Sequence, residues 1–212
     1  MSPGPDGSDA IEAGPLARGE TGAAARALAA AFLDDPVATA IGPRRRSHRR
    51  AIAPLSFSGI VAASARHGGR VDVARSAGEV VGVSIAFDPG RWPITDGAAV
   101  YELAWALLAG PLPISRGISF DRTVRASHVD HEHMYLWFLG VHPAAQGRGV
   151  GRTLLADLHG RSDERGVPTY LETGTMDNVA WYASLGYELL GEIELPNGAP
   201  LWRMQRPEGP SG

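Results

Sequence analysis

Apolar residues recur at helical spacing along much of the chain. Leu28 and Phe32 lie one turn apart in an alanine-rich run, and Asp34-Asp35-Pro36 ends this run because a residue before proline disfavours helical backbone angles. Glycines and prolines bound similar stretches further along. Helices are therefore predicted over residues 20–33, from after Pro43 to Gly68, from Asp96 to Gly110, over 114–127, from the glycine-rich turn at 146–151 to near Gly166, and over 179–185.

Runs of β-branched and aromatic residues alternate with these helices. Residues 70–74 and 80–87 are two such runs, and the short connection between them contains Gly78, which suits an antiparallel hairpin. Residues 133–141 are apolar and aromatic with no charge, which predicts a strand buried on both faces at the centre of a sheet. Further strands are predicted at 169–173, 187–195 and 200–205, the last two flanking Pro196-Asn197-Gly198.

The order of these elements indicates mixed α/β structure around one sheet. At 212 residues, with 44% hydrophobic and 20% charged residues, the chain has the length and composition of one compact domain. Its two ends are rich in residues that cannot bury apolar surface. We therefore expect disorder in residues 1–8 and 207–212, and a single domain over residues 9–206.

Charge and residue types exclude several classes of function. The formal net charge is −3, so nucleic acid is not an expected partner. The basic run at residues 44–50 fits the solvated start of a helix, because no aromatic residues interleave with it. The absence of cysteine excludes thiolate nucleophiles and cysteine-ligated zinc. Neither a membrane-spanning run nor a secretory signal is visible, so we expect no membrane partner and a cytoplasmic location.

The candidate chemistry begins at Gln146-Gly147-Arg148-Gly149-Val150-Gly151, which follows the central strand and opens a helix. Alternating glycines let backbone N–H groups point into one concavity, and the helix dipole adds positive charge there. Arg148 and Arg152 supply full charges that suit a diphosphate. A dinucleotide fingerprint needs glycine where Arg152 stands, and a P-loop needs Gly-Lys-Ser/Thr, so both common alternatives fail.

The turn resembles the coenzyme A pyrophosphate signature Gln/Arg-x-x-Gly-x-Gly/Ala of the GCN5-related N-acetyltransferase (GNAT) superfamily. Gln146, Gly149 and Gly151 stand in its defining places. Other segments between Met134 and about Met204 are similar to family motifs as well, namely Val141-His-Pro143, Asn178-Val-Ala-Trp-Tyr182 and Leu185-Gly-Tyr187. The puromycin N-acetyltransferase branch is the one that Leu171-Glu-Thr173 and the ending Leu195-Pro-Asn-Gly-Ala-Pro-Leu-Trp202 resemble.

The resemblance implies a fold, a cofactor and a binding site. The fold is a central mixed, mostly antiparallel sheet flanked by helices and splayed at the central strand, and the cofactor is acetyl-CoA. The implied cofactor-binding residues are Leu139, Gly140, Val141, Gln146, Gly147, Arg148, Gly149, Val150, Gly151, Arg152, Asn178 and Tyr182.

Acyl transfer from a thioester to an amine needs a proton for the departing thiolate, a stabilised oxyanion and a neutral nucleophile. Tyr182 matches the family's general acid, although a core tyrosine would look the same in a sequence. The resemblance also implies that the central strand parts from its neighbour at a bulge, which Gly140 would permit, and exposes N–H groups around Leu139 to Val141.

Two residues are candidates for the general base. His133 shares a strand face with Tyr135 and titrates near neutrality, although a histidine that merely packs at a strand end fits the pattern as well. Glu172 on the adjacent strand is the second candidate, and either residue could act through a water molecule. His128, His131 and His133 also suggest a metal site, but the family chemistry needs no metal, so none is expected.

The predicted function is direct transfer of an acetyl group from acetyl-CoA to a primary amine of a small molecule, and the branch resemblance implies an amino-nucleoside or a similar antibiotic. Acetylation of a protein N-terminus or lysine is an alternative that needs an open groove, against which a closed pocket with Trp92 and Trp105 would argue. A catalytically silent acyl-CoA-binding regulatory module is a further alternative. The chain is expected to be a monomer or a homodimer.

Overall fold

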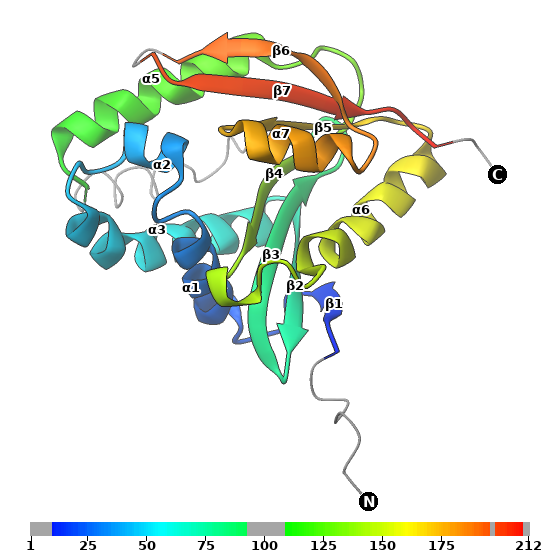
Figure 1. The fold of residues 1–212 in the computed structure, drawn as a ribbon, viewed down its shortest axis with the longest axis horizontal. Coiled ribbons are helices and arrows are strands. Elements are labelled where there is room, and N and C mark those ends of the chain that lie inside the picture. Colours follow the sequence, from blue (N-terminus) through cyan, green and yellow to red (C-terminus); the bar gives the residue numbers. More distant parts are fainter. Residues whose placement is uncertain (1–9, 93–108, 196–197, 210–212) are drawn as a thin grey trace, which may run out of the picture.

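A computed structural model describes residues 10–92, 109–195 and 198–209 of the chain. Seven strands form one open sheet in the order β1-β2-β3-β4-β5-β7-β6, and the only parallel neighbours among them are β4 and β5 (Figure 1). The strands are β1 (Glu12–Pro15), β2 (Gly69–Ser76), β3 (Glu79–Phe87), β4 (Met134–Val141), β5 (Thr169–Thr173), β6 (Glu188–Glu194) and β7 (Pro200–Arg206). The predicted fold class, a mixed and mostly antiparallel sheet flanked by helices, is confirmed.

Helices cover both faces of this sheet. One face packs on α1 and α3 around Leu28, Val61 and Tyr170, and the other packs on α6 and α7 around Leu155 and Met204, all of them fully buried. The helices are α1 (Thr21–Ala31), α2 (Pro36–Ile41), α3 (Arg46–Arg66), α5 (Pro111–Ser127), α6 (Val150–Arg165) and α7 (Met176–Ala183), with a short 3-10 helix η2 at Pro143–Ala145. Each predicted element within the described residues is present.

Besides the short helix η2, the structure adds two elements that the sequence pattern did not predict. The strand β1 is four residues long and pairs with β2 at the edge of the sheet. The helix α2 begins at Pro36, because the carboxylate of Asp35 caps it by accepting from the N–H of Ala38 at 2.9 Å. The stop signal at Pro36 is therefore also a start signal. The helix predicted from Asp96 to Gly110 lies almost wholly outside the described residues.

The central strand parts from its parallel neighbour, as predicted. β4 and β5 pair only from Met134 opposite Thr169 to Leu136 opposite Leu171, so the rest of β4 has no partner on that side. For this reason Trp137 to Leu139 are only half-buried, and the prediction of a strand buried on both faces is correct for its first half alone. The gap between β4 and β5 is the structural feature on which the site depends.

The bulge in β4 lies at Trp137 and not at Gly140, which corrects the prediction. Phe138 pairs with Ile85 and Leu136 with Ala86, so Trp137 is the extra residue. Gly140 pairs regularly with β3, and a Cβ there would lie 2.8 Å from Leu28. The lack of a side chain at Gly140 therefore lets α1 pack close against the sheet. Side chains of a regular strand point alternately to the two faces of the sheet, and the extra residue reverses this order beyond Trp137. Leu136 and Leu139 therefore both pack on the face that carries α6 and α7.

The basic run at residues 44–50 stabilises local structure at the start of α3. Arg46 forms a two-pronged ion pair with Asp34, with contacts of 2.8 and 2.6 Å. Arg49 donates to the carbonyl groups of Leu33 and Pro43. These contacts agree with the prediction of a helix start. Within the described ranges no helix is long and apolar enough to cross a membrane.

The burial of His159 predicts that the stability of the fold depends on pH. His159 lies on α6, its Nε2 is 3.0 Å from the Tyr187 hydroxyl, and burial lowers its pKa from 6.5 to about 4. The folded protein thus favours the neutral ring, so its contribution to stability is complete above pH 6.5 and is lost as the pH falls toward 4. We expect the free energy of unfolding, measured with denaturant, to fall by about 2 kcal/mol between pH 8 and pH 5, a loss that His159→Gln lacks. An equal loss in both proteins would contradict this.

Candidate active site

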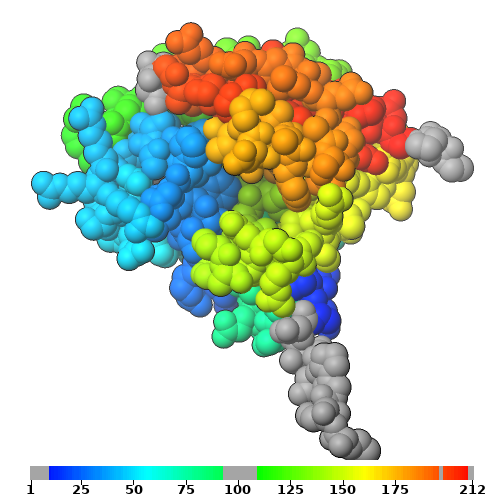
Figure 2. All heavy atoms as spheres, in the orientation of Figure 1, coloured from blue at the N-terminus to red at the C-terminus, as the bar shows by residue number. Residues whose placement is uncertain are grey.

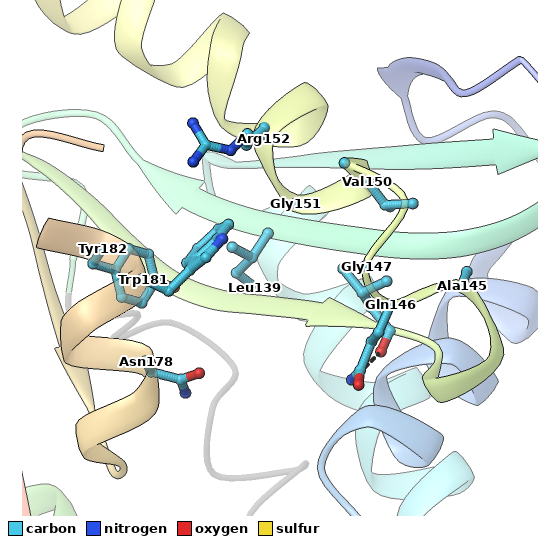
Figure 3. A pocket seen from close by; sticks show the side chains of 12 residues that line it. Leu139, Ala145, Gln146, Gly147, Val150, Gly151, Arg152, Asn178, Trp181 and Tyr182 are labelled. Carbon is cyan, nitrogen blue, oxygen red and sulfur yellow. Dashed lines mark hydrogen bonds between the residues drawn. The ribbon is translucent and has the colours of Figure 1, made fainter. Parts of the chain in front are cut away.

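A cavity of about 350 Å³ opens where β4 and β5 part. The recess between α7 and the turn before α6 is visible in Figure 2, and Figure 3 shows the side chains around it. Its walls come from β4, the glycine-rich turn, the start of α6, and α7. They consist of Leu139, Val141, Ala145, Gln146, Gly147, Gly149, Val150, Gly151, Arg152, Asn178, Trp181 and Tyr182. Apart from Gly140 and Arg148, every predicted cofactor-binding residue lines this cavity.

The glycine-rich turn has the backbone geometry of an anion cradle. Gly147 and Gly149 have φ values of 75° and 83°, in the left-handed region, and a Cβ on either would point into open space. The N–H of Thr153 donates to the carbonyl of Gly149 at 3.1 Å, which is the first hydrogen bond of the helix. The N–H groups of the residues just before Thr153 therefore have no acceptor within the helix. Gln146 fixes the entry to the turn by donating from Nε2 to the carbonyl of Val141 at 3.2 Å (Figure 3).

The two arginines of the turn lie in different places. Arg152 lines the cavity and donates from Nη2 to the Ser184 hydroxyl at 3.2 Å. Arg148 instead reaches the β2 end, where its Nη2 lies 3.4 Å from the Ser76 hydroxyl. Arg152 is therefore the better placed of the two to meet a phosphate in the cavity.

Charge reversal at each arginine in turn should separate their contributions to coenzyme A binding. Arg152→Glu should raise the coenzyme A dissociation constant by about tenfold or more, since it replaces a charge-assisted donor by a repelling carboxylate. Arg148→Glu is the matched control, with the same charge change outside the cavity, and we expect a smaller rise. Isothermal titration calorimetry measures both. A larger effect at Arg148 would place the phosphates on the β2 side.

Tyr182 is buried against the sheet face that carries α6 and α7. Only 7% of it is exposed, its ring packs 4.8 Å from that of Trp181 and 5.3 Å from that of Tyr187, and burial raises the pKa of its hydroxyl well above the usual range. The hydroxyl therefore keeps its proton at neutral pH, which a general acid requires. Its catalytic role stays a prediction.

The two predicted bases meet on the opposite face of the sheet. Glu172 follows directly after Leu171, the last residue of β5 that pairs with β4, and its side chain is 7% exposed. Its Oε2 accepts from the Tyr135 hydroxyl at 2.7 Å, and its Oε1 lies 3.5 Å from Nδ1 of His128. Nε2 of His128 lies 3.0 Å from Nε2 of His133. We call Glu172, His128, His133 and Tyr135 the glutamate-histidine cluster.

Aromatic rings and burial shape this cluster. Trp92 stacks on His128 with ring centroids 4.5 Å apart and meets Tyr135 edge-on at 4.9 Å. Burial lowers the pKa of His133, and a backbone contact with His131 opposes that shift only in part. Burial, helped by the charge of Glu172, raises the pKa of Tyr135 far above its usual value. Tyr135 thus remains a hydrogen donor to Glu172.

Sequence reasoning missed three of the residues that form these sites. Ala145 and Trp181 line the cavity, and the Cβ that Gly151 lacks would lie 3.0 Å from Trp181, so a small residue there accommodates the indole. His128 was considered only as a metal ligand, yet it joins the two predicted bases. Within the described part of the chain no group of His, Asp or Glu side chains is arranged to hold a metal ion. Trp105 lies outside the described residues.

Comparison with known proteins agrees with this geometry. The family model of the acetyltransferase (GNAT) family matches residues 47–187, which include β4, the glycine-rich turn and α7. Among solved structures, one described as histone acetyltransferase HPA2 and related acetyltransferase, from Corynebacterium glutamicum, is similar over 94% of this chain and 97% of its own, with a TM-score of 0.68 and 23% identity.

Two further solved structures share the fold. The ribosomal-protein-S18-alanine N-acetyltransferase of Escherichia coli is similar over 96% of this chain and 97% of its own, with a TM-score of 0.56 and 16% identity. The yncA protein of Salmonella typhimurium, solved with its cofactor acetyl-CoA, is similar over 95% of this chain and 96% of its own, with a TM-score of 0.55 and 19% identity.

Proposed function

Because the chain belongs to the GNAT acetyltransferase family, we propose that it transfers the acetyl group of acetyl-CoA directly to the primary amine of a small molecule. The coenzyme supplies the activated acetyl thioester. The residues of the cavity fit this group, because they combine left-handed glycines that leave N–H groups uncovered with Arg152 for the negative charge of a diphosphate.

Residues on the two faces of the sheet are assigned the proton transfers and the stabilisation of negative charge. Tyr182, one of the residues that line the cavity, holds a proton at its buried hydroxyl and is assigned the protonation of the leaving thiolate. Beyond Leu136 the edge of β4 that faces β5 has no strand partner, so N–H groups of the segment Leu139 to Val141 can point into the gap and stabilise negative charge on oxygen. Glu172 stands at the start of the gap on the other face, where it can take a proton from an incoming ammonium.

The observation that carries the choice of acceptor is the enclosure of Glu172. The carboxylate of Glu172 is 7% exposed, Tyr135 donates a hydrogen bond to it, and Trp92 stacks on its neighbour His128. An ammonium at this site would therefore meet one negative charge and aromatic faces at short distance. An enclosed carboxylate of this kind favours a small amine over a polypeptide, which needs a groove along which its backbone lies. The resemblance to the puromycin N-acetyltransferase branch supports an amino-nucleoside as the first acceptor to test.

The test is a panel of acceptors assayed with acetyl-CoA for released thiol. The panel includes amino-nucleosides, other small primary amines, peptides with free N-terminal alanine, and a lysine peptide. We expect turnover with a small amine and a kcat/KM at least about tenfold above that of any peptide. Preference for a peptide would make the protein a protein acetyltransferase. Coenzyme binding by calorimetry without turnover of any acceptor would make it a silent binding module.

A further inference from the structure

The glutamate-histidine cluster forms an unbroken line of contacts from the gap in the sheet to the protein surface. Glu172 Oε1 faces His128 Nδ1 at 3.5 Å, the two Nε2 atoms of His128 and His133 are 3.0 Å apart, and Nδ1 of His133 lies 2.7 Å from the carbonyl oxygen of His131. The side chain of Glu172 is buried, whereas His133 at the other end of the line is only half-buried. The histidines therefore connect the predicted base with solvent.

The hydrogens on this line can be assigned from chemistry alone. The carbonyl of His131 only accepts, so Nδ1 of His133 carries a hydrogen. One hydrogen must lie between the two Nε2 atoms. His128 Nδ1 and Glu172 Oε1 are both buried and neither has a hydrogen-bond partner among the described residues. The buried hydroxyl of Tyr170 can donate to Glu172, but a hydrogen between Nδ1 and Oε1 is what would satisfy His128.

These contacts need one hydrogen more than two neutral imidazoles and a carboxylate hold. The excess proton can sit on Glu172, on His128 or on His133, and it changes place by short shifts along the same contacts. Without it, the lone pair of His128 Nδ1 would face a buried carboxylate oxygen, which costs free energy. The geometry thus describes a line of three sites that share one mobile proton.

We propose that Glu172, His128 and His133 form a proton relay that carries the proton of the acceptor ammonium from the gap between β4 and β5 to solvent, with His128 as its indispensable middle member. The inference rests on the proposed function. Each site takes one proton and gives one: the ammonium protonates a Glu172 oxygen, Glu172 passes a proton to His128 Nδ1, the hydrogen of His128 Nε2 passes to His133 Nε2, and His133 releases one proton to water. The number of protons on the relay is the same before and after, and the amine is left neutral.

The surroundings favour outward movement. Burial lowers the pKa of His133, so a proton that arrives there leaves readily. Tyr135 donates to the second oxygen of Glu172 and stabilises the carboxylate after the proton has left. The other titratable or charged groups around the relay are the side chain of His131, Tyr170, Asp121, Arg203 on the neighbouring strand β7 and, over the ring of Trp92, Arg125.

The kinetic test compares His128→Gln with the parent protein across pH 6.5 to 9.5, using the best amine from the acceptor panel. Glutamine keeps polar contacts but cannot pass a proton, so kcat at pH 7 should fall by about ten- to a hundredfold. The loss should shrink toward high pH, where amines arrive without a proton, and added imidazole should restore part of the rate at pH 7. His159→Gln is the matched control, since it removes another half-buried histidine that contacts a tyrosine, and its profile should follow that of the parent.

A spectroscopic measurement tests the relay without catalysis. In protein labelled with ¹⁵N at histidine and free of coenzyme, the ring nitrogens of His128 and His133 should shift together in a single pH transition, because they share one proton. His133→Gln should move the transition seen at His128. Independent transitions, or His128→Gln activity within about twofold of the parent at every pH, would overturn the relay. If no amine is acetylated by the parent, the proposed function fails, and the shared transition still decides whether the relay exists.

Discussion

Tyr182→Phe should lower kcat by about a hundredfold while acetyl-CoA binds as it does to the parent protein. The substitution keeps the ring, which packs between Trp181 and Tyr187, and removes only the hydroxyl. Within the described residues that hydroxyl donates to no partner, so its removal breaks no structural hydrogen bond. Steady-state kinetics with the best amine, together with calorimetry for the coenzyme, measure the two effects separately.

Tyr187→Phe is the matched control for this experiment. Its hydroxyl contacts His159 on the side of α6, away from the cavity lining, so the same loss of one oxygen should change stability and leave kcat within about twofold. If Tyr182→Phe loses less than about threefold in kcat, Tyr182 is a packing residue. The family assignment would be unaffected, because it rests on other residues.

Gly149→Val should abolish measurable coenzyme binding at concentrations that saturate the parent, a loss of about a hundredfold or more in affinity. Gly149 has a φ of 83°, and a β-branched residue is strained there whatever space surrounds it. The added side chain also enters the open space at the start of α6, where the uncovered N–H groups point. Calorimetry and a melting-temperature shift with coenzyme A both report the loss.

Gly160→Val is the control, since Gly160 lies on the same helix, has no positive φ, and has open space where a Cβ would stand. It should bind coenzyme A with parental affinity. Gly149→Val should also lower the free energy of unfolding by about 1 to 3 kcal/mol. If it binds coenzyme A normally, the turn does not hold the phosphates.

Most of the residues that were predicted to bind the cofactor line the cavity, because their conformations depend on local backbone chemistry. Alternating glycines at the start of a helix leave the same N–H groups uncovered in any fold that places a strand before them. The direction of the Arg148 side chain has no such local cause. It depends on Ser76, which a distant part of the chain brings near. The sequence pattern therefore identified the cradle but could not tell which arginine lines it.

The glutamate-histidine cluster could not be predicted either, because it depends on contacts between distant parts of the chain. His133 and Glu172 were predicted as alternative bases, because their distance depends on the register of β4 against β5. His128 follows the end of α5, so its place between them depends on how that helix packs. The bulge at Trp137 also decides which side chains of β4 face the cavity. The sequence could not predict this bulge, because residues on both faces of β4 are apolar and a shift by one residue leaves the hydrophobic pattern unchanged.

The brevity of the β4 and β5 pairing has a mechanical consequence. Only the stretch from Met134 to Leu136 ties the antiparallel group β1-β2-β3-β4 to the group β5-β7-β6 within the sheet. Side chains of α6 and α7 connect the two groups on one face, since Leu155 and Tyr182 share a core with Leu136 and Leu171. The two groups of strands therefore share few backbone hydrogen bonds, and we expect a ligand bound in the gap between β4 and β5 to contact both groups and to lower the mobility of residues that it does not touch.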